Sequence, residues 1–291
     1  MLRETTRRTD VGFDVTGALT LAVGTGGLMF ALNQAPSRGV DATIAAAVAL
    51  GLAGLAAFAF VESRVAFPLL PLEFFRRRNF TASMLAALFS GAAYMGGFVL
   101  APLMLQSVFA LSVSATSLVM LLRPASFAIT SPIGGSIATR RGERPVAMFG
   151  SATIAVALVL LGLAGTWDVL WLIAIGLVLQ GIGNGTAQPT ITATMSNSVV
   201  EADLGIAAAA QRMAFQVGSA LGISMLTSIY GGTERAADFL AAYLVGAAIG
   251  AAALVFSSLM RSTPRGQPIP STAGSQSSRR SVIASSLRPS R

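Results

Sequence analysis

The chain has 291 residues, of which 54% are hydrophobic and 11% charged, and its mean hydropathy is +0.71. Soluble domains carry about a quarter charged residues, so this composition excludes a protein that faces water on every side. The absence of cysteine and histidine excludes thiol nucleophiles, histidine bases and the usual zinc ligands. We therefore expect no enzyme, no catalytic residue, no metal and no cofactor.

Charged residues are segregated from long apolar runs. Each run is near or above the roughly 20 residues that a helix needs to cross the hydrocarbon core, and only helices or closed barrels satisfy the backbone in lipid. Barrel strands would be shorter and alternating, so we predict an all-α integral membrane protein. The runs without Asp, Glu or Arg are 15–37, 42–61, 79–122, 145–167, 169–200, 213–233 and 239–260.

Two of these runs are too long for one crossing. The run 79–122 is predicted to turn near 107–117, where serines and β-branched residues gather. The run 169–200 is predicted to leave the bilayer near Pro189, which is followed by the polar stretch TATMSNS. Eight membrane spans result, at about 15–34, 42–62, 80–107, 114–138, 145–165, 169–193, 207–230 and 238–260.

The arginines orient these spans. With a cytoplasmic N-terminus, sixteen arginines fall inside and two outside, as the positive-inside rule requires. The net charge of +8 thus reflects topology in the cytoplasmic (plasma) membrane, with both termini inside, and no nucleic-acid partner is expected. The predicted parts are a cytoplasmic segment 1–13, a helix pair 14–62, an interfacial linker 63–79, a six-helix block 80–260 and a disordered cytoplasmic tail 261–291.

The loop GSIATRRGER, residues 135–144, joins the second and third helices of the six-helix block. It resembles the G-x-x-x-D-R-x-G-R-R loop signature of the major facilitator superfamily, which lies at that position in a six-helix half. The match rests on Gly135, Arg140, Gly142 and Arg144. Thr139 stands where the signature has a carboxylate, so the loop lacks the acidic group that the resemblance assigns to switching between states.

Three further stretches resemble the fourteen-helix drug:proton antiporters of that superfamily: 67–80, 101–112 and 204–226. The resemblance, over about residues 10–260, implies that the first two spans are the central pair of that branch and that the others form its C-terminal half. It further implies export of amphipathic small molecules against protons, together with an N-terminal half that this chain lacks and that is either encoded separately or lost. In the last stretch Gln216 and Gly218 match, and Phe215 replaces an expected arginine.

Arg123 lies inside the fourth predicted span and is followed by Pro124. A charge in the membrane costs about 2.5–3.5 kcal/mol on insertion scales, so it is a functional candidate. Arg123 either contacts an anion or substrate in a central cavity, pairs with a carboxylate of the other half, or extends to the outer interface.

A polar stripe marks the sixth span. Gln180, Asn184 and Gln188 recur at intervals of four, which places their amides on one helical face. They line the transport path, as the resemblance favours for the first helix of a three-helix repeat, or they form hydrogen bonds between helices. Gln216, by its match, and Tyr94, whose ring would meet a hydrophobic drug, complete the path candidates; packing in an apolar helix explains Tyr94 equally well.

Acidic residues are confined to loops and span ends, and histidine is absent, so the predicted membrane interior holds no proton carrier. The chain alone is therefore not expected to run proton-coupled export. The alternative to a transporter is a non-transporting fragment, or a scaffold or binding subunit, in the lipid bilayer with the same fold.

Overall fold

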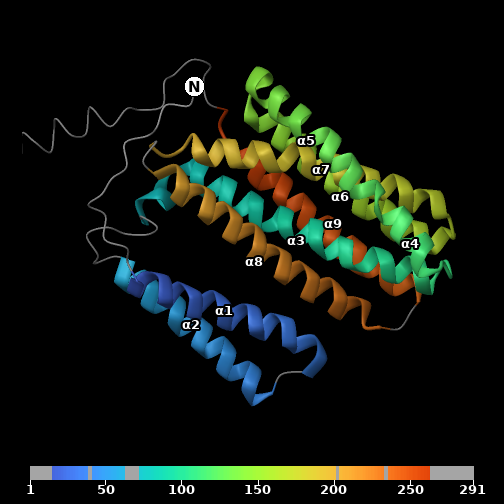
Figure 1. Cartoon of the computed structure of the whole chain (residues 1–291), viewed down its shortest axis with the longest axis horizontal. Helices are drawn as coiled ribbons and strands as arrows, with labels where there is room; N and C mark the ends of the chain where they lie inside the picture. The colour runs from blue at the N-terminus through green and yellow to red at the C-terminus, as the bar shows by residue number, and fades with distance from the viewer. Residues whose placement is uncertain (1–14, 39–40, 63–71, 201–202, 233–234, 263–291) are drawn as a thin grey trace, which may run out of the picture. The chain divides into compact units, whose positions relative to one another are not determined.

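The computed structural model describes residues 15–38, 41–62, 72–200, 203–232 and 235–262. Its helices follow one another along the chain as coloured in Figure 1. They are α1 (Val15–Arg38), α2 (Ala42–Glu62), a short 3₁₀ helix (Leu72–Arg76), α3 (Arg78–Ser107), α4 (Val113–Met120), α5 (Leu122–Arg141), α6 (Glu143–Trp167), α7 (Leu170–Ser196), α8 (Leu204–Tyr230) and α9 (Ala236–Leu259). The predicted N-terminal segment, most of the linker and nearly all of the tail lie outside the described residues.

The helices are long and apolar enough to cross a membrane. Seven segments meet that description when α4 and α5 are taken as one, and α1 adds a shorter apolar stretch, Val15–Ala31. The predicted all-α membrane fold of eight spans is thereby confirmed.

The first unit of the chain, up to Arg76, is a hairpin of α1 and α2. Its two helices meet at glycines: a Cβ on Gly54 would lie 2.6 Å from the backbone nitrogen of Gly24, and one on Gly27 would lie 2.9 Å from the Ala47 carbonyl oxygen. Small residues let membrane helices approach backbone to backbone. Asp41 precedes α2, and its side chain accepts a hydrogen bond from the Ile44 N–H at 2.8 Å, which satisfies a free donor of the first turn.

The second unit, from Arg77 onward, is a six-helix bundle of two three-helix repeats. Helix α3 packs mainly against α8 and α9, whereas α7 packs mainly against α5 and α6, and α6 also packs against α9. If α3 is exchanged with α7, α5 with α8 and α6 with α9, the α3–α8 contact becomes the α7–α5 contact and the α6–α7 contact becomes the α9–α3 contact. The α6–α9 contact is unchanged by this exchange. This is the contact pattern of inverted repeats related by a pseudo-two-fold axis in the membrane plane.

Glycines make the closest contacts of the bundle. A Cβ on Gly218 of α8 would overlap the Leu88 carbonyl oxygen of α3, and one on Gly222 would overlap the Ala92 carbonyl oxygen. The G-x-x-x-G of α8 is thus a packing motif.

The fourth predicted span is interrupted. It consists of α4 and α5, joined at Leu121, whose N–H donates to the Leu118 carbonyl at 3.3 Å. Pro124 has no N–H, so the Met120 carbonyl lacks its usual partner four residues along the chain, and helices break at such points. The interruption at Leu121 lies two residues before Arg123.

Helix α7 contains Pro189, as the predicted span 169–193 does, and ends three residues beyond that span. The helix continues through Pro189 to Ser196, so this proline does not end it. A proline removes one backbone hydrogen bond, and in membrane helices neighbouring polar groups can form hydrogen bonds with the carbonyl that is left free.

Candidate functional site

The Arg123 side chain is buried inside the six-helix bundle. It is 2% exposed, although it lies ten residues into the 113–141 span, about 15 Å along the helix at 1.5 Å per residue. The guanidinium therefore does not reach the surface, and the alternative in which it extends to the outer interface is wrong.

The guanidinium packs against two aromatic rings of α3. Its central carbon, Cζ, lies 3.5 Å from the centroid of the Tyr94 ring and 4.0 Å from that of the Phe98 ring. One terminal nitrogen donates a hydrogen bond to the Tyr94 backbone carbonyl at 3.2 Å. The Nε group is buried without a partner, and among the described residues no carboxylate forms an ion pair with Arg123. The charge is stabilised by cation–π contacts but has no counter-charge in this part of the chain.

Gln180 of α7 contributes a second set of unpartnered groups. Its side chain is fully buried, and neither its amide nitrogen nor its amide oxygen has a hydrogen-bond partner. The nitrogen packs so tightly on Gly97 of α3 that a Cβ there would lie 2.6 Å from it. The adjoining Gly181 contacts the Arg123 carbonyl oxygen, and a Cβ at this glycine would overlap that oxygen. Gln180 and Arg123 are thereby brought to the same region, between α3, α5 and α7.

The three residues of the polar stripe of α7 differ in whether their side chains form hydrogen bonds. Asn184 is 4% exposed, and its Oδ1 is buried without a partner. Gln188, one turn further, accepts a hydrogen bond from Nε2 of Gln211 on α8 at 2.8 Å. The pairing alternative thus describes Gln188, whereas Gln180 and Asn184 keep unpaired amide atoms inside the bundle.

The remaining path candidates lie apart from one another. The Tyr94 ring is buried beneath Arg123, whereas Gln216 is exposed on α8. Two residues at the sites were missed from the sequence: Tyr243 of α9, whose hydroxyl donates to the Gly97 carbonyl at 3.4 Å, and Gln211. Both are polar groups in apolar helices, which was the available signal. We call Arg123, Tyr94, Gln180, Asn184 and Tyr243 the buried polar cluster, and the exposed ring of Phe98 lies at its edge.

The loop signature lies at the junction of α5 and α6. Gly142 ends α5 with φ of 92°, a conformation that favours glycine. Thr139 is exposed and donates to the Ser136 carbonyl of its own helix. Arg140 and Arg144 are exposed, and a Cβ on Gly135 would meet nothing within 4 Å.

A carboxylate is nevertheless present at this loop. Glu143, in the first turn of α6, is 9% exposed and accepts a hydrogen bond from Nδ2 of Asn197 at 2.9 Å. Asn197 is the C-cap of α7. A negative charge in the first turn complements the helix dipole, so Glu143 joins the loop to the end of α7.

Replacing Glu143 by alanine should loosen this junction. The hydrogen bond to a charged acceptor is worth about 1.5–3 kcal/mol, so local opening should rise roughly tenfold or more. Tryptic cleavage of the purified protein after Arg140 and Arg141 should accelerate accordingly. Glu143→Gln keeps an acceptor oxygen, so its cleavage rate should lie between those of the wild type and of Glu143→Ala. Asp203→Ala is the matched control, because Asp203 is the N-cap of α8 and forms no side-chain cap hydrogen bond. Equal cleavage of all three variants would contradict the role of Glu143.

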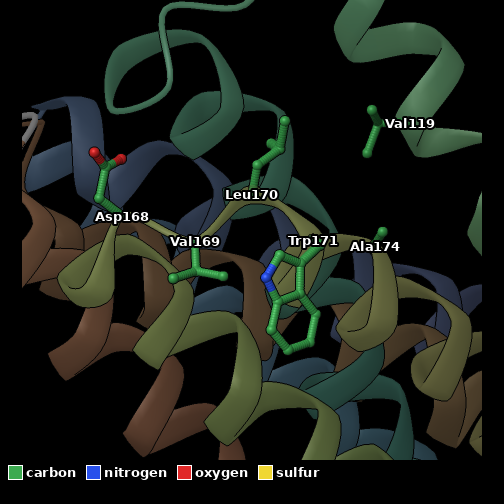
Figure 2. A pocket seen from close by; sticks show the side chains of 6 residues that line it. All are labelled: Val119, Asp168, Val169, Leu170, Trp171 and Ala174. Carbon is green, nitrogen blue, oxygen red and sulfur yellow. The ribbon is translucent and has the colours of Figure 1, made fainter.

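A hollow of about 540 Å³ opens at the α6–α7 corner, the end opposite this loop. Figure 2 shows the Trp171 ring between Val169 and Ala174, with Val119 contributed by a different helix. Both tryptophans of the chain, Trp167 and Trp171, are exposed at this corner. Tryptophan is enriched at membrane–water interfaces, and the hollow shares no residue with the buried polar cluster.

The fold and the cluster together define a multi-pass helical membrane protein, built on inverted three-helix repeats around buried polar groups. The sequence profile described as the Major Facilitator Superfamily matches residues 83–290, and the chain belongs to that family. The assignment that rested on the loop signature is thereby confirmed.

Relatives of the chain are named for drug transport or drug resistance. It is 28% identical over 225 residues to the multidrug transporter protein MdtP of Bacillus subtilis, covering 75% of this chain and 41% of that protein. It is 31% identical over 219 residues to a tetracycline resistance determinant of Streptomyces rimosus, covering 74% and 63%. It is 29% identical over 231 residues to the multidrug efflux pump LfrA of Mycolicibacterium smegmatis, covering 78% and 45%. The chain thus spans less than two thirds of the length of these relatives.

Proposed function

We propose that the chain is part of an exporter that moves amphipathic small molecules out of the cell in exchange for protons. The observation that carries this proposal is the buried polar cluster, because an apolar bundle that only spans a membrane has no use for unpaired amides and a guanidinium. The names of the relatives, which refer to multidrug transport, tetracycline resistance and multidrug efflux, support the same substrate class.

The proposed path runs along α3 and α7, the first helices of the two repeats. Tyr94, Arg123, Gln180 and Asn184 supply its polar surface. Gln188 and Gln216 border it towards the end at which α7 finishes and α8 begins, since both lie in that half of their helices. Transport occurs when a second six-helix half rocks against this one around the shared site.

Proton coupling is assigned to that second half. The described carboxylates lie at helix ends or between helices, at positions 41, 62, 73, 143, 168, 203 and 238. A proton carrier in the membrane interior is therefore expected from a six-helix N-terminal half. The proposed location is the cytoplasmic membrane with both termini inside, as the arginine distribution favours.

The same placement of carboxylates favours a second candidate, a non-transporting scaffold or binding subunit. Such a subunit would bind small molecules at the cluster without moving them. The two candidates differ in whether a proton gradient drives movement.

Reconstitution separates them. The chain is placed in proteoliposomes, alone or co-reconstituted with the six N-terminal helices of a fourteen-helix relative, and a fluorescent lipophilic dye is followed under an imposed pH gradient. We expect gradient-driven dye movement with both parts, abolished by a protonophore, and none with the chain alone. Movement by the chain alone would contradict the need for a second half. No movement in either sample, with the intact relative active in parallel, would favour the binding subunit.

A further inference from the structure

We propose that the buried polar cluster is an anion site that takes a carboxylate, and that the substrates of this protein include acidic amphipathic compounds. The word substrate rests on the proposed function, whereas binding of the carboxylate does not.

The charge of Arg123 has no counter-charge in the described part of the chain. Arg123 carries a positive charge that is 2% exposed and has no ion-pair partner among the described residues. Arginine stays charged in proteins, so it cannot lower the cost of burial by losing its proton. Aromatic faces attract a cation without neutralising it. A bound anion is the group that would.

The free N–H donors of Arg123 point away from the two aromatic rings. The Tyr94 and Phe98 rings lie against the guanidinium carbon at 3.5 and 4.0 Å. The N–H groups of a guanidinium point outward along its edge, in a fork that matches the two oxygens of a carboxylate. One terminal nitrogen is engaged with the Tyr94 carbonyl, and Nε is unengaged. The edge thus retains donors for a planar acceptor with one negative charge.

Two amide side chains of α7 are buried with atoms that have no hydrogen-bond partner. Gln180 has an unpartnered donor and an unpartnered acceptor, and Asn184 an unpartnered acceptor. Both side chains are more than nine-tenths buried. Buried polar atoms are nearly always hydrogen-bonded in native structures, so these groups indicate a missing ligand. A compound with a carboxylate for Arg123 and a hydroxyl or amide group for the α7 side chains would satisfy them.

The surroundings favour an amphipathic acid over a free inorganic anion. Leu158 of α6 lies beside Gly97, and the two rings add apolar surface next to the charge. A carboxylate on an apolar body matches this combination. A carboxylate side chain of another helix would offer the same chemistry, and the experiment must separate the two sources.

The test uses the full chain purified in lipid nanodiscs. Thermal unfolding is followed while 4-phenylbutyrate is titrated, with 4-phenylbutyramide and 4-phenylbutylamine as a neutral and a cationic match. A ligand that binds only the folded protein raises the unfolding temperature in a saturable way. We expect this rise with the acid and not with the amide or the amine.

Substitutions locate the effect. Arg123→Gln should weaken the apparent affinity for 4-phenylbutyrate about tenfold or more, as loss of a charged hydrogen bond does. Gln180→Leu should weaken it less, and this variant also serves if Arg123→Gln fails to fold. Arg212→Gln removes an exposed arginine of α8 and should leave the response unchanged. A response that is equal in Arg123→Gln or Gln180→Leu, or a wild-type protein that ignores the acid, would overturn the site.

A further arm distinguishes the source of the carboxylate. The titration is repeated on the chain co-purified with the six N-terminal helices of a relative. A retained response supports acidic substrates. A response that vanishes while Arg123→Gln weakens association of the two parts would overturn the substrate claim, because a protein carboxylate then fills the site. Binding is measured without transport, so loss of dye export in the proteoliposomes would leave this result unaffected.

Discussion

Replacing Gly218 by alanine is expected to destabilise the six-helix bundle by about 2 kcal/mol or more, as over-packing of a tight contact does. The new methyl group would overlap the Leu88 carbonyl oxygen, a backbone atom that moves only if α3 moves. Gly91 and Gly96 of α3 press on α8 in the same way, at the carbonyls of Phe215 and Gly222. The helices would have to separate along much of their length.

The measurement is thermal unfolding of the purified protein in detergent. The unfolding temperature should fall by about 4–8 °C for a unit of this size. Gly205→Ala is the matched control, because Gly205 lies on the same helix and a Cβ there would meet nothing within 4 Å. Alanine is the better helix former, so this variant should be as stable as the wild type or slightly more stable. Equal loss in both variants would show that the close α3–α8 contact is not the cause.

Replacing Arg123 by methionine is expected to stabilise the ligand-free protein. The buried charge costs about 2.5–3.5 kcal/mol in the membrane, and its unpartnered Nε adds about 1–3 kcal/mol. Two cation–π contacts return roughly 2–4 kcal/mol at about 1–2 kcal/mol each. Methionine has a similar length, and its sulfur also packs favourably on aromatic rings. The net gain should be about 2 kcal/mol.

This gain would appear as a rise in unfolding temperature of about 4–8 °C. Arg212→Met should change stability by no more than about 0.5 kcal/mol, because Arg212 is exposed. A stabilised Arg123→Met protein would identify Arg123 as a residue retained at a cost, which is typical of functional sites. A large loss of stability would instead identify it as a structural anchor of α3 and α5.

The sequence predicted the course of the chain because apolar runs and arginine-rich loops are read directly from composition. It predicted the turn between α3 and α4 for the same reason, from a polar and β-branched interval. It predicted a span at 169–193 that contains Pro189 but not that α7 continues to Ser196, because neighbouring helices decide where a membrane helix with a proline ends. The interruption at Leu121 depends likewise on how α4 and α5 pack, although Pro124 marked the place.

The site was only partly predictable. The spacing of Gln180, Asn184 and Gln188 fixed a common face, but not which amide would find a partner, because Gln211 comes from another helix. The contact between Arg123 and Tyr94 joins residues that are 29 positions apart in the chain, and no local sequence pattern encodes it. Thr139 drew attention to a missing carboxylate in the loop, whereas Glu143 four residues later pairs with Asn197.

The two repeats of the bundle are not electrically equivalent. Gly181 of α7 meets the carbonyl of Arg123 on α5, and its counterpart, Gly91 of α3, meets the carbonyl of Phe215 on α8. A phenylalanine thus stands at the α3–α8 contact where the α7–α5 contact has the arginine, and Arg123 lies ten residues into the 113–141 span. A full elementary charge that crosses the membrane exchanges about 2.3 kcal/mol with each 100 mV of potential. Any tilt of this bundle that shifts Arg123 through part of the bilayer therefore exchanges a matching part of that energy with the membrane voltage.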